Sequence, residues 1–128
     1  MINVMIVDDS SIIRKIFSDH IEKMGYKVVG AAKDGREAIK LYEELRPDLV
    51  TMDITMPIMN GIDSLKAIKS KFSDAKVIMI TSHGEEKLVM EAISSGAKGY
   101  VLKPITPENV QQAIFKVFPE LATSKPPL

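Results

Sequence analysis

The sequence predicts an α/β fold in which a parallel β-sheet is covered by helices on both faces. Five short apolar runs, typical of strands buried on both faces, alternate with five segments whose apolar residues recur at helical spacing. Such alternation favours a parallel sheet joined by helical crossovers. The chain has 128 residues, which suits one domain with one hydrophobic core.

The expected strands are short, and four of the five run directly into a polar residue. We place them at 4–7, from 28–29 onward, and at 49–52, 77–80 and 100–102. The polar residues that follow the first, third, fourth and fifth strands are Asp8, Asp53, Thr81 and Lys103.

The expected helices carry apolar stripes within residues 12–24, 38–45, 62–72, 88–93 and 110–117. Gly25 and Pro47 end the first two helices, and Asp34 is the expected N-cap of the second. Thr106 and the proline after it mark the start of the last helix. We expect one domain over 1–118 and a tail or linker start over 119–128, where the sequence becomes rich in Ser, Thr and Pro.

The composition excludes several classes of protein. The chain is 45% hydrophobic, and its 17 basic and 17 acidic residues cancel, which indicates neither a disordered chain nor a nucleic-acid or membrane-surface binder. It has no cysteine, which excludes disulfides and thiolate metal sites. The apolar run at the start is too short for a signal peptide or a bilayer span, so we expect a cytoplasmic protein. We also expect the protein to be a monomer.

The polar residues at the strand ends are expected to form one site. All strands of a parallel sheet end along the same edge, where open α/β sheets bind ligands at the point of strand-order reversal. If the strand order is 2-1-3-4-5, that point lies between the first and third strands, which carry Asp8, Asp9 and Asp53. The structural alternative is that Asp9 or Ser10 only caps the following helix.

Three carboxylates at this edge would repel one another, and at least one pKa would rise. Mg²⁺ would remove the conflict, because it prefers oxygen ligands and commonly binds one or two carboxylates together with phosphate oxygens. Lys103 and Thr81 could hold the remaining oxygens of a phosphoryl group. The set therefore indicates phosphoryl transfer to a carboxylate.

Four motifs, in order, resemble the receiver domain of bacterial and archaeal response regulators, above all its stand-alone chemotaxis members. They are Val-Asp-Asp-Ser-Ser at 7–11, Met-Asp-Ile-Thr-Met-Pro at 52–57 with Asn-Gly at 60–61, Thr-Ser at 81–82, and Gly-Tyr-Val-Leu-Lys-Pro at 99–104. The resemblance spans roughly residues 3–118. It implies a flavodoxin-like (βα)5 three-layer sandwich with strand order 2-1-3-4-5.

The resemblance also implies a role for each site residue. Asp53 would be the phosphoacceptor, and Asp9 and Asp53 would bind Mg²⁺ together with the backbone carbonyl of Thr55. Asp8 would bind the ion through water. Thr81 and Lys103 would contact phosphoryl oxygens, and the Lys103–Pro104 bond would be cis.

A signalling switch follows from the same resemblance. The phosphoryl group would add about two negative charges, Thr81 would move toward it, and Tyr100 would turn inward. The surface of the fourth helix, fifth strand and fifth helix would then change. The implied partners are a CheA-like sensor histidine kinase, a flagellar or archaellar motor switch protein as target, and a phosphatase. Thr55 and His83 occupy positions that vary in the family and tune hydrolysis of the acyl phosphate.

Three alternatives remain open at this stage. The chain could be a receiver excised from a longer regulator with a DNA-binding or enzymatic output domain. A hydrolytic phosphatase is disfavoured, because its signature needs a second aspartate where this chain has Thr55. A receiver unable to be phosphorylated is disfavoured because every chemical position is present. We therefore expect a phosphoacceptor without turnover of external substrates, not an enzyme.

Overall fold

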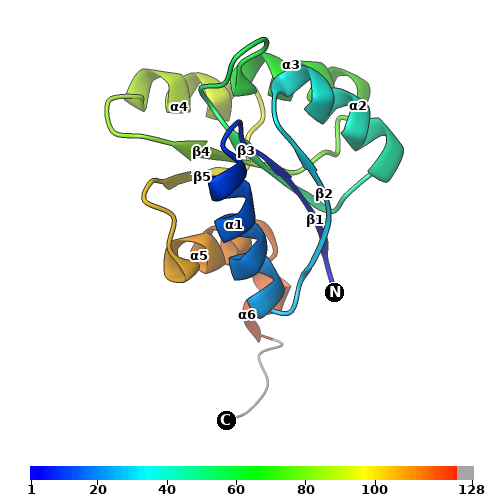
Figure 1. Ribbon diagram of the computed structural model, residues 1–128, viewed down its shortest axis with the longest axis vertical. Coiled ribbons are helices and arrows are strands. Elements are labelled where there is room, and N and C mark those ends of the chain that lie inside the picture. Colours follow the sequence, from blue (N-terminus) through cyan, green and yellow to red (C-terminus); the bar gives the residue numbers. More distant parts are fainter. Residues whose placement is uncertain (124–128) are drawn as a thin grey trace.

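The computed structural model describes residues 1–123, which form a parallel sheet between two layers of helices (Figure 1). The sheet has the order β2-β1-β3-β4-β5, and every neighbouring pair is parallel. The strands are β1 (Asn3–Val7), β2 (Lys27–Ala32), β3 (Leu49–Asp53), β4 (Val77–Thr81) and β5 (Gly99–Leu102). The predicted fold class and strand order are confirmed.

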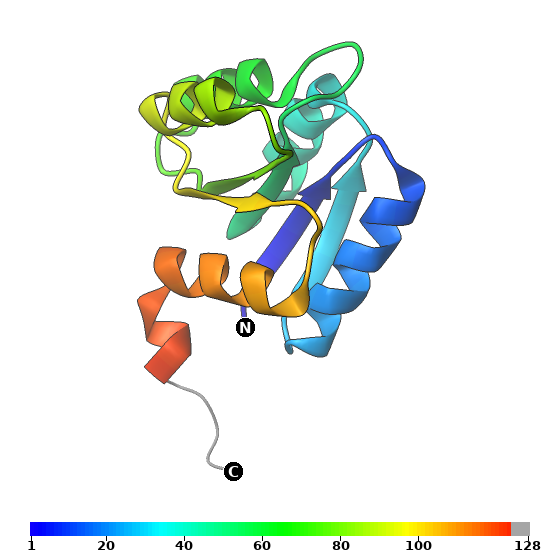
Figure 2. The same ribbon diagram turned by 90° about the vertical axis from the view of Figure 1, so that its left-hand side faces the viewer.

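Helices cover both faces of this sheet (Figure 2). One face carries α1 and α5, and the other carries α2, α3 and α4. The helices are α1 (Ser11–Lys23), α2 (Gly35–Leu45), α3 (Gly61–Lys71), α4 (Glu86–Ser94), α5 (Pro107–Val117) and α6 (Pro119–Thr123). Within residues 1–123, no helix is both long enough and apolar enough to cross a bilayer.

The two helical layers create two cores, one on each face of the sheet. Successive side chains of a strand point to opposite faces, so Met5 and Val7 pack toward α2, α3 and α4 while Val4 and Ile6 pack toward α1 and α5. All four side chains are at most 1% exposed. Burial of each such side chain contributes about 1.5–3 kcal/mol, so the central strands form a rigid support for the residues at their ends.

Polar side chains cap the N-termini of several helices at the edge of the sheet where the strands end. Ser10 Oγ accepts a hydrogen bond from the backbone N–H of Ile13 at 3.3 Å, and Asn60 Oδ1 accepts one from that of Asp63 at 2.9 Å. Ser10, not Asp9, therefore caps α1, which resolves one of the sequence alternatives.

The apolar stripes overestimate burial at some positions. Ile12 on α1 is 70% exposed and Ile16 is 40% exposed, because α1 meets the sheet through Phe17 and Ile21. On α4, Val89 packs against the core, whereas Ile93 is exposed. The helical repeat thus predicts which face of a helix packs against the sheet, but not which residues of that face are buried.

The short helix α6 was not predicted. Its Leu121 packs against the core beneath α5, and the backbone N–H of Leu121 donates to the carbonyl of Phe118 at 3.0 Å. Residues 119–123 therefore form a short helix that contacts the same core as α5. The rest of the expected tail, 124–128, lies outside the described residues, and the division at 118 stays a prediction.

Candidate functional site

The register of the sheet brings the chemically active residues together at one edge. Val7 pairs with Met52, so Asp8 and Asp53 follow at the same level of neighbouring strands. On the other side Asp53 pairs with Ile80, which places Thr81 one residue further along β4.

The same reasoning extends to β5. Thr81 pairs with Leu102, so Lys103 is the next residue along that edge. The backbone N–H of Lys103 donates to the carbonyl of Thr81 at 2.7 Å, which ties the two strand ends together. The Lys103–Pro104 peptide bond is cis, as the resemblance implied.

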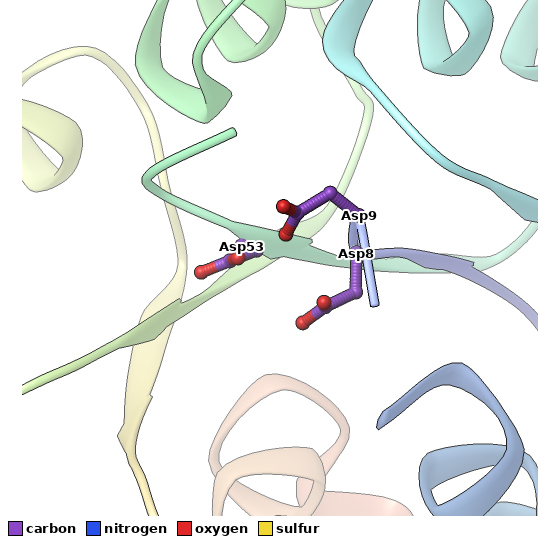
Figure 3. A group of neighbouring side chains, drawn as sticks. All are labelled: Asp8, Asp9 and Asp53. Atoms are coloured by element: carbon purple, nitrogen blue, oxygen red, sulfur yellow. The ribbon is translucent and has the colours of Figure 1, made fainter. Parts of the chain in front are cut away.

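Three carboxyl groups surround one space at this edge (Figure 3). Asp8 and Asp9 leave the loop after β1, and Asp53 ends β3. One carboxylate oxygen from each lies within 4.8 Å of those from the other two. Asp8 and Asp53 are buried, whereas Asp9 is exposed. Three oxygen donors at this separation fit a hard divalent cation such as Mg²⁺.

Lys103 offsets only part of this negative charge. Its Nζ lies 3.6 Å from Asp53 Oδ1 and 3.7 Å from Asp8 Oδ2. These distances suit ion pairs and exceed those of short charge-assisted hydrogen bonds, at about 2.7–2.9 Å. One ammonium group therefore faces two buried carboxylates, and the site holds excess negative charge.

The electrostatic conflict appears in the pKa of Asp53. Burial is the largest cause, and the neighbouring Asp8 carboxylate adds to it, with Lys103 opposing and Asp9 contributing further repulsion. Together they raise the pKa of Asp53 from 3.8 to about 7. This rise is the effect that the sequence predicted for at least one of the three carboxylates. A bound cation would relieve the repulsion, which is a second respect in which the residues fit Mg²⁺.

Asp8 is held in place by its own loop. Its Oδ1 accepts a hydrogen bond from the backbone N–H of Ser10 at 2.9 Å, and its carbonyl accepts one from Arg14 Nη1 at 2.7 Å. Its backbone N–H donates to the carbonyl of Ala32 at 3.1 Å, which joins the loop to the end of β2. The position of Asp8 is thus set by contacts to two neighbouring elements. The sequence gives no signal for Arg14, because nothing in its helical position distinguishes it from a solvated charge.

Thr81 and Thr55 both contact a residue that the sequence analysis missed. Thr81 Oγ1 donates to Glu85 Oε1 at 2.9 Å, and Thr55 Oγ1 donates to Glu85 Oε2 at 2.6 Å. No pattern in the sequence separates Glu85 from the glutamate that follows it, since its contacts with Thr81 and Thr55 depend on the path of the loop.

Two further residues singled out in the sequence lie at the surface. Tyr100 is 54% exposed, and His83 is exposed as well.

Gly61 allows the backbone after Asp53 to turn tightly. A Cβ at Gly61 would overlap the carbonyl oxygen of Asp53 and would lie 3.0 Å from Cα of Ile54. The backbone N–H of Gly61 also donates to the carbonyl of Ile54 at 2.7 Å. The first turn of α3 therefore packs directly on the backbone that carries Asp53.

We expect Gly61→Ala to destabilise the fold by about 2 kcal/mol, because the added methyl meets backbone atoms that cannot rotate away. Gly99→Ala is the matched control, since nothing lies within 4 Å of a Cβ at that position. Urea unfolding of both variants measures the difference. Equal stability of the two variants would contradict the close approach at Gly61.

The fold and the site together define a class of protein. The family model for the response regulator receiver domain matches residues 4–115. The chain belongs to the family of response regulator receiver domains, in agreement with the sequence resemblance.

The chain is also similar to particular members of this family. The chain is 49% identical over 114 residues to the chemotaxis protein CheY of Thermotoga maritima, covering 89% of this chain and 95% of that protein. It is 43% identical to CheY of Bacillus subtilis over 88% of this chain and 94% of that protein. A similar solved structure is the CheX–CheY–BeF3–Mg²⁺ complex of Borrelia burgdorferi, with a TM-score of 0.88, 39% identity, and coverage of 91% of this chain and 89% of that one.

Proposed function

We propose that this protein is a phosphorylation-activated response regulator of a two-component system that acts in chemotaxis. One observation carries the proposal: the buried Asp53 carboxylate lies 3.6 Å from Lys103 Nζ, beside Asp8 and Asp9. The CheY relatives support the chemotaxis role. The chain spans 95% and 94% of those two proteins. The alternative is a receiver excised from a longer regulator.

The acidic residues are the proposed Mg²⁺ ligands. Asp9, Asp53 and the backbone carbonyl of Thr55 would bind the ion directly, and Asp8 would bind it through water. Bound Mg²⁺ would supply positive charge that offsets the charge of a phosphoryl group during transfer. The excess negative charge at Asp8, Asp9 and Asp53 supports this assignment.

In the proposed reaction, Asp53 accepts a phosphoryl group from a phosphohistidine of a sensor histidine kinase. An Oδ atom of Asp53 forms a bond to phosphorus as the bond between phosphorus and the imidazole nitrogen breaks, and the electron pair stays on that nitrogen. Asp53 must be ionised to attack. Lys103 helps to keep it so and then pairs with a phosphoryl oxygen.

Phosphorylation then changes the surface that partners contact. The Thr81 hydroxyl donates a hydrogen bond to a phosphoryl oxygen, and the loop after β4 moves with it. Tyr100, exposed in this structure, turns inward into the space that Thr81 leaves. The altered surface of α4, β5 and α5 binds the target, such as a motor switch protein, and a phosphatase returns the protein to its resting state. The protein acts as a monomer in the cytoplasm and turns over no external substrate.

Incubation with acetyl phosphate tests this proposal. We expect the intact mass to increase by one phosphoryl group when Mg²⁺ is present, and no increase when EDTA removes the ion. Asp53→Ala should show no increase under either condition. Asp19→Ala, which removes an exposed carboxylate on α1, is the control and should behave as the wild type. Equal mass gain in Asp53→Ala and the wild type would contradict the proposed acceptor.

A further inference from the structure

The side chain of Glu85 connects two loops at the phosphorylation site. Its Oε2 accepts the 2.6 Å hydrogen bond from Thr55 in the loop after β3, and its Oε1 accepts the 2.9 Å bond from Thr81 at the end of β4. The backbone N–H of Ser82 donates to the same Oε1 at 2.6 Å. One carboxylate thus accepts hydrogen bonds from Thr55, two residues after Asp53, and from Thr81, at the end of the neighbouring strand β4.

The Glu85 side chain bonds to residues of the site and does not cap α4, the helix that Glu85 precedes. Glu85 occupies the N-cap position of α4, yet its side chain makes no capping hydrogen bond to that helix. Instead, its two carboxylate oxygens accept three hydrogen bonds from residues of the site, namely Thr55, Ser82 and Thr81.

The bond from Thr81 to Glu85 competes with the bond that phosphorylation requires. A threonine hydroxyl has one proton to donate. In this structure its acceptor is Glu85, and the carbonyl of Ser82 is a more distant alternative at 3.4 Å. Thr81 cannot donate to a phosphoryl oxygen until it leaves Glu85.

We propose that Glu85 is a positioning residue that holds Thr81 in the resting arrangement and must release it when Asp53 is phosphorylated. This inference rests on the proposed function and adds a residue that opposes the switch. By holding Thr55 as well, Glu85 keeps the loops after β3 and β4 together in the resting state. Loss of Glu85 therefore favours the arrangement in which Thr81 faces Asp53.

Binding of beryllofluoride with Mg²⁺, measured by titration calorimetry, tests the proposal, because beryllofluoride imitates an acyl phosphate. We expect Glu85→Ala to bind about tenfold more tightly than the wild type, since it loses a hydrogen bond to a charged acceptor. Glu86→Ala is the matched control. It removes the same charge one residue further on, and among the described residues no hydrogen bond involves the Glu86 side chain. We expect its affinity to match that of the wild type.

A third variant separates the hydrogen bonds from the charge. Glu85→Gln keeps a single acceptor oxygen and no charge, so its affinity should fall between those of the wild type and Glu85→Ala. An affinity equal to that of Glu85→Ala, with Glu86→Ala also tighter than the wild type, would indicate a charge effect and overturn the proposal. Thermal unfolding checks that all three variants fold.

The backbone N–H of Ser82 donates to the same Glu85 Oε1 that accepts from Thr81, so the amide resonance of Ser82 reports whether that oxygen stays in place. In the protein without ligand, we expect this resonance far downfield, as its short bond to a carboxylate requires, and we expect it to move upfield in Glu85→Ala. Beryllofluoride and Mg²⁺ should move the wild-type resonance in the same direction. If the ligand binds without moving it, Glu85 does not release and the proposal fails.

Failure of the inference can be told apart from failure of the proposed function. If the wild type does not bind beryllofluoride in the presence of Mg²⁺, the proposed function fails and the role of Glu85 fails with it. If the wild type binds, and Glu85→Ala binds with equal or lower affinity, only the role of Glu85 is overturned.

Discussion

Asp53→Asn is expected to stabilise the metal-free protein by about 3 kcal/mol at pH 8. Burial, the neighbouring Asp8 and the opposing Lys103 leave the pKa of Asp53 at about 7 instead of 3.8. Each unit of such a shift corresponds to about 1.4 kcal/mol. We set the expected gain below the full amount because solvent at the edge of the sheet screens part of the charge. The amide keeps the shape of the side chain and removes its buried charge.

The pH dependence of this effect has a definite sign. Because the pKa of Asp53 is higher in the folded protein than in the unfolded chain, folding takes up a proton between these two values. The contribution of Asp53 to stability is fully present below about pH 4 and is lost as the pH rises through about 7. The free energy of unfolding of the variant should therefore equal that of the wild type near pH 4, exceed it increasingly up to about pH 7 and keep a nearly constant excess up to pH 8.

Urea unfolding from pH 4 to pH 8 in the presence of EDTA measures this difference. Asp19→Asn is the control, and it should change stability by less than about 0.5 kcal/mol because its carboxylate lies in an exposed pair with Lys15. A constant difference between Asp53→Asn and the wild type across this range would show that Asp53 titrates normally. Adding Mg²⁺ should stabilise the wild type more than the variant, since the ion binds the ionised carboxylate.

Lys103→Met is expected to slow phosphorylation by acetyl phosphate about tenfold to a hundredfold, the range for loss of one charge-assisted contact. Lys103 Nζ lies within 3.7 Å of both buried carboxylates. Without it, burial and the repulsion from Asp8 act unopposed, so the pKa of Asp53 rises further and less of the ionised nucleophile is present near pH 7. The variant also lacks the cation proposed to pair with a phosphoryl oxygen.

The initial rate of mass gain with acetyl phosphate and saturating Mg²⁺ measures this effect. Lys98→Met removes the same charge from an exposed residue before β5 and should leave the rate unchanged. Raising the pH should restore part of the rate in Lys103→Met, because it restores the ionised Asp53. If Lys103→Met reacts as fast as Lys98→Met, Lys103 has no role in the transfer.

Much of the site could be predicted from the sequence because a parallel sheet leaves little freedom at its edge. Once five strands are placed, the residues that end them must converge, which located Asp8, Asp53, Thr81 and Lys103 without any coordinates. The prediction that Asp53 is the phosphoacceptor came from the family resemblance. The site adds a physical argument for Asp53, because burial and the neighbouring Asp8 raise its pKa to about 7.

The other contacts of the site, and the burial of individual helix residues, depend on side-chain directions and loop paths that no sequence pattern specifies. Glu85 and Arg14 reach the site from helical or loop positions where a charged residue is ordinarily solvated. Ile12 matches the apolar repeat of α1 but points to solvent. The periodicity of apolar residues thus predicted which helices and strands form. The packing of each element determines which of its side chains are buried and which reach the site.

The most direct test of the central claim is the location of the phosphoryl group. Borohydride reduces an acyl phosphate to an alcohol, so a phosphorylated aspartate becomes homoserine. After reaction with acetyl phosphate and Mg²⁺, followed by borohydride, peptide mass spectrometry should find homoserine at position 53, and at neither Asp8 nor Asp9. Homoserine at position 8 or 9, or an unmodified Asp53 in a protein that has gained phosphoryl mass, would contradict the account.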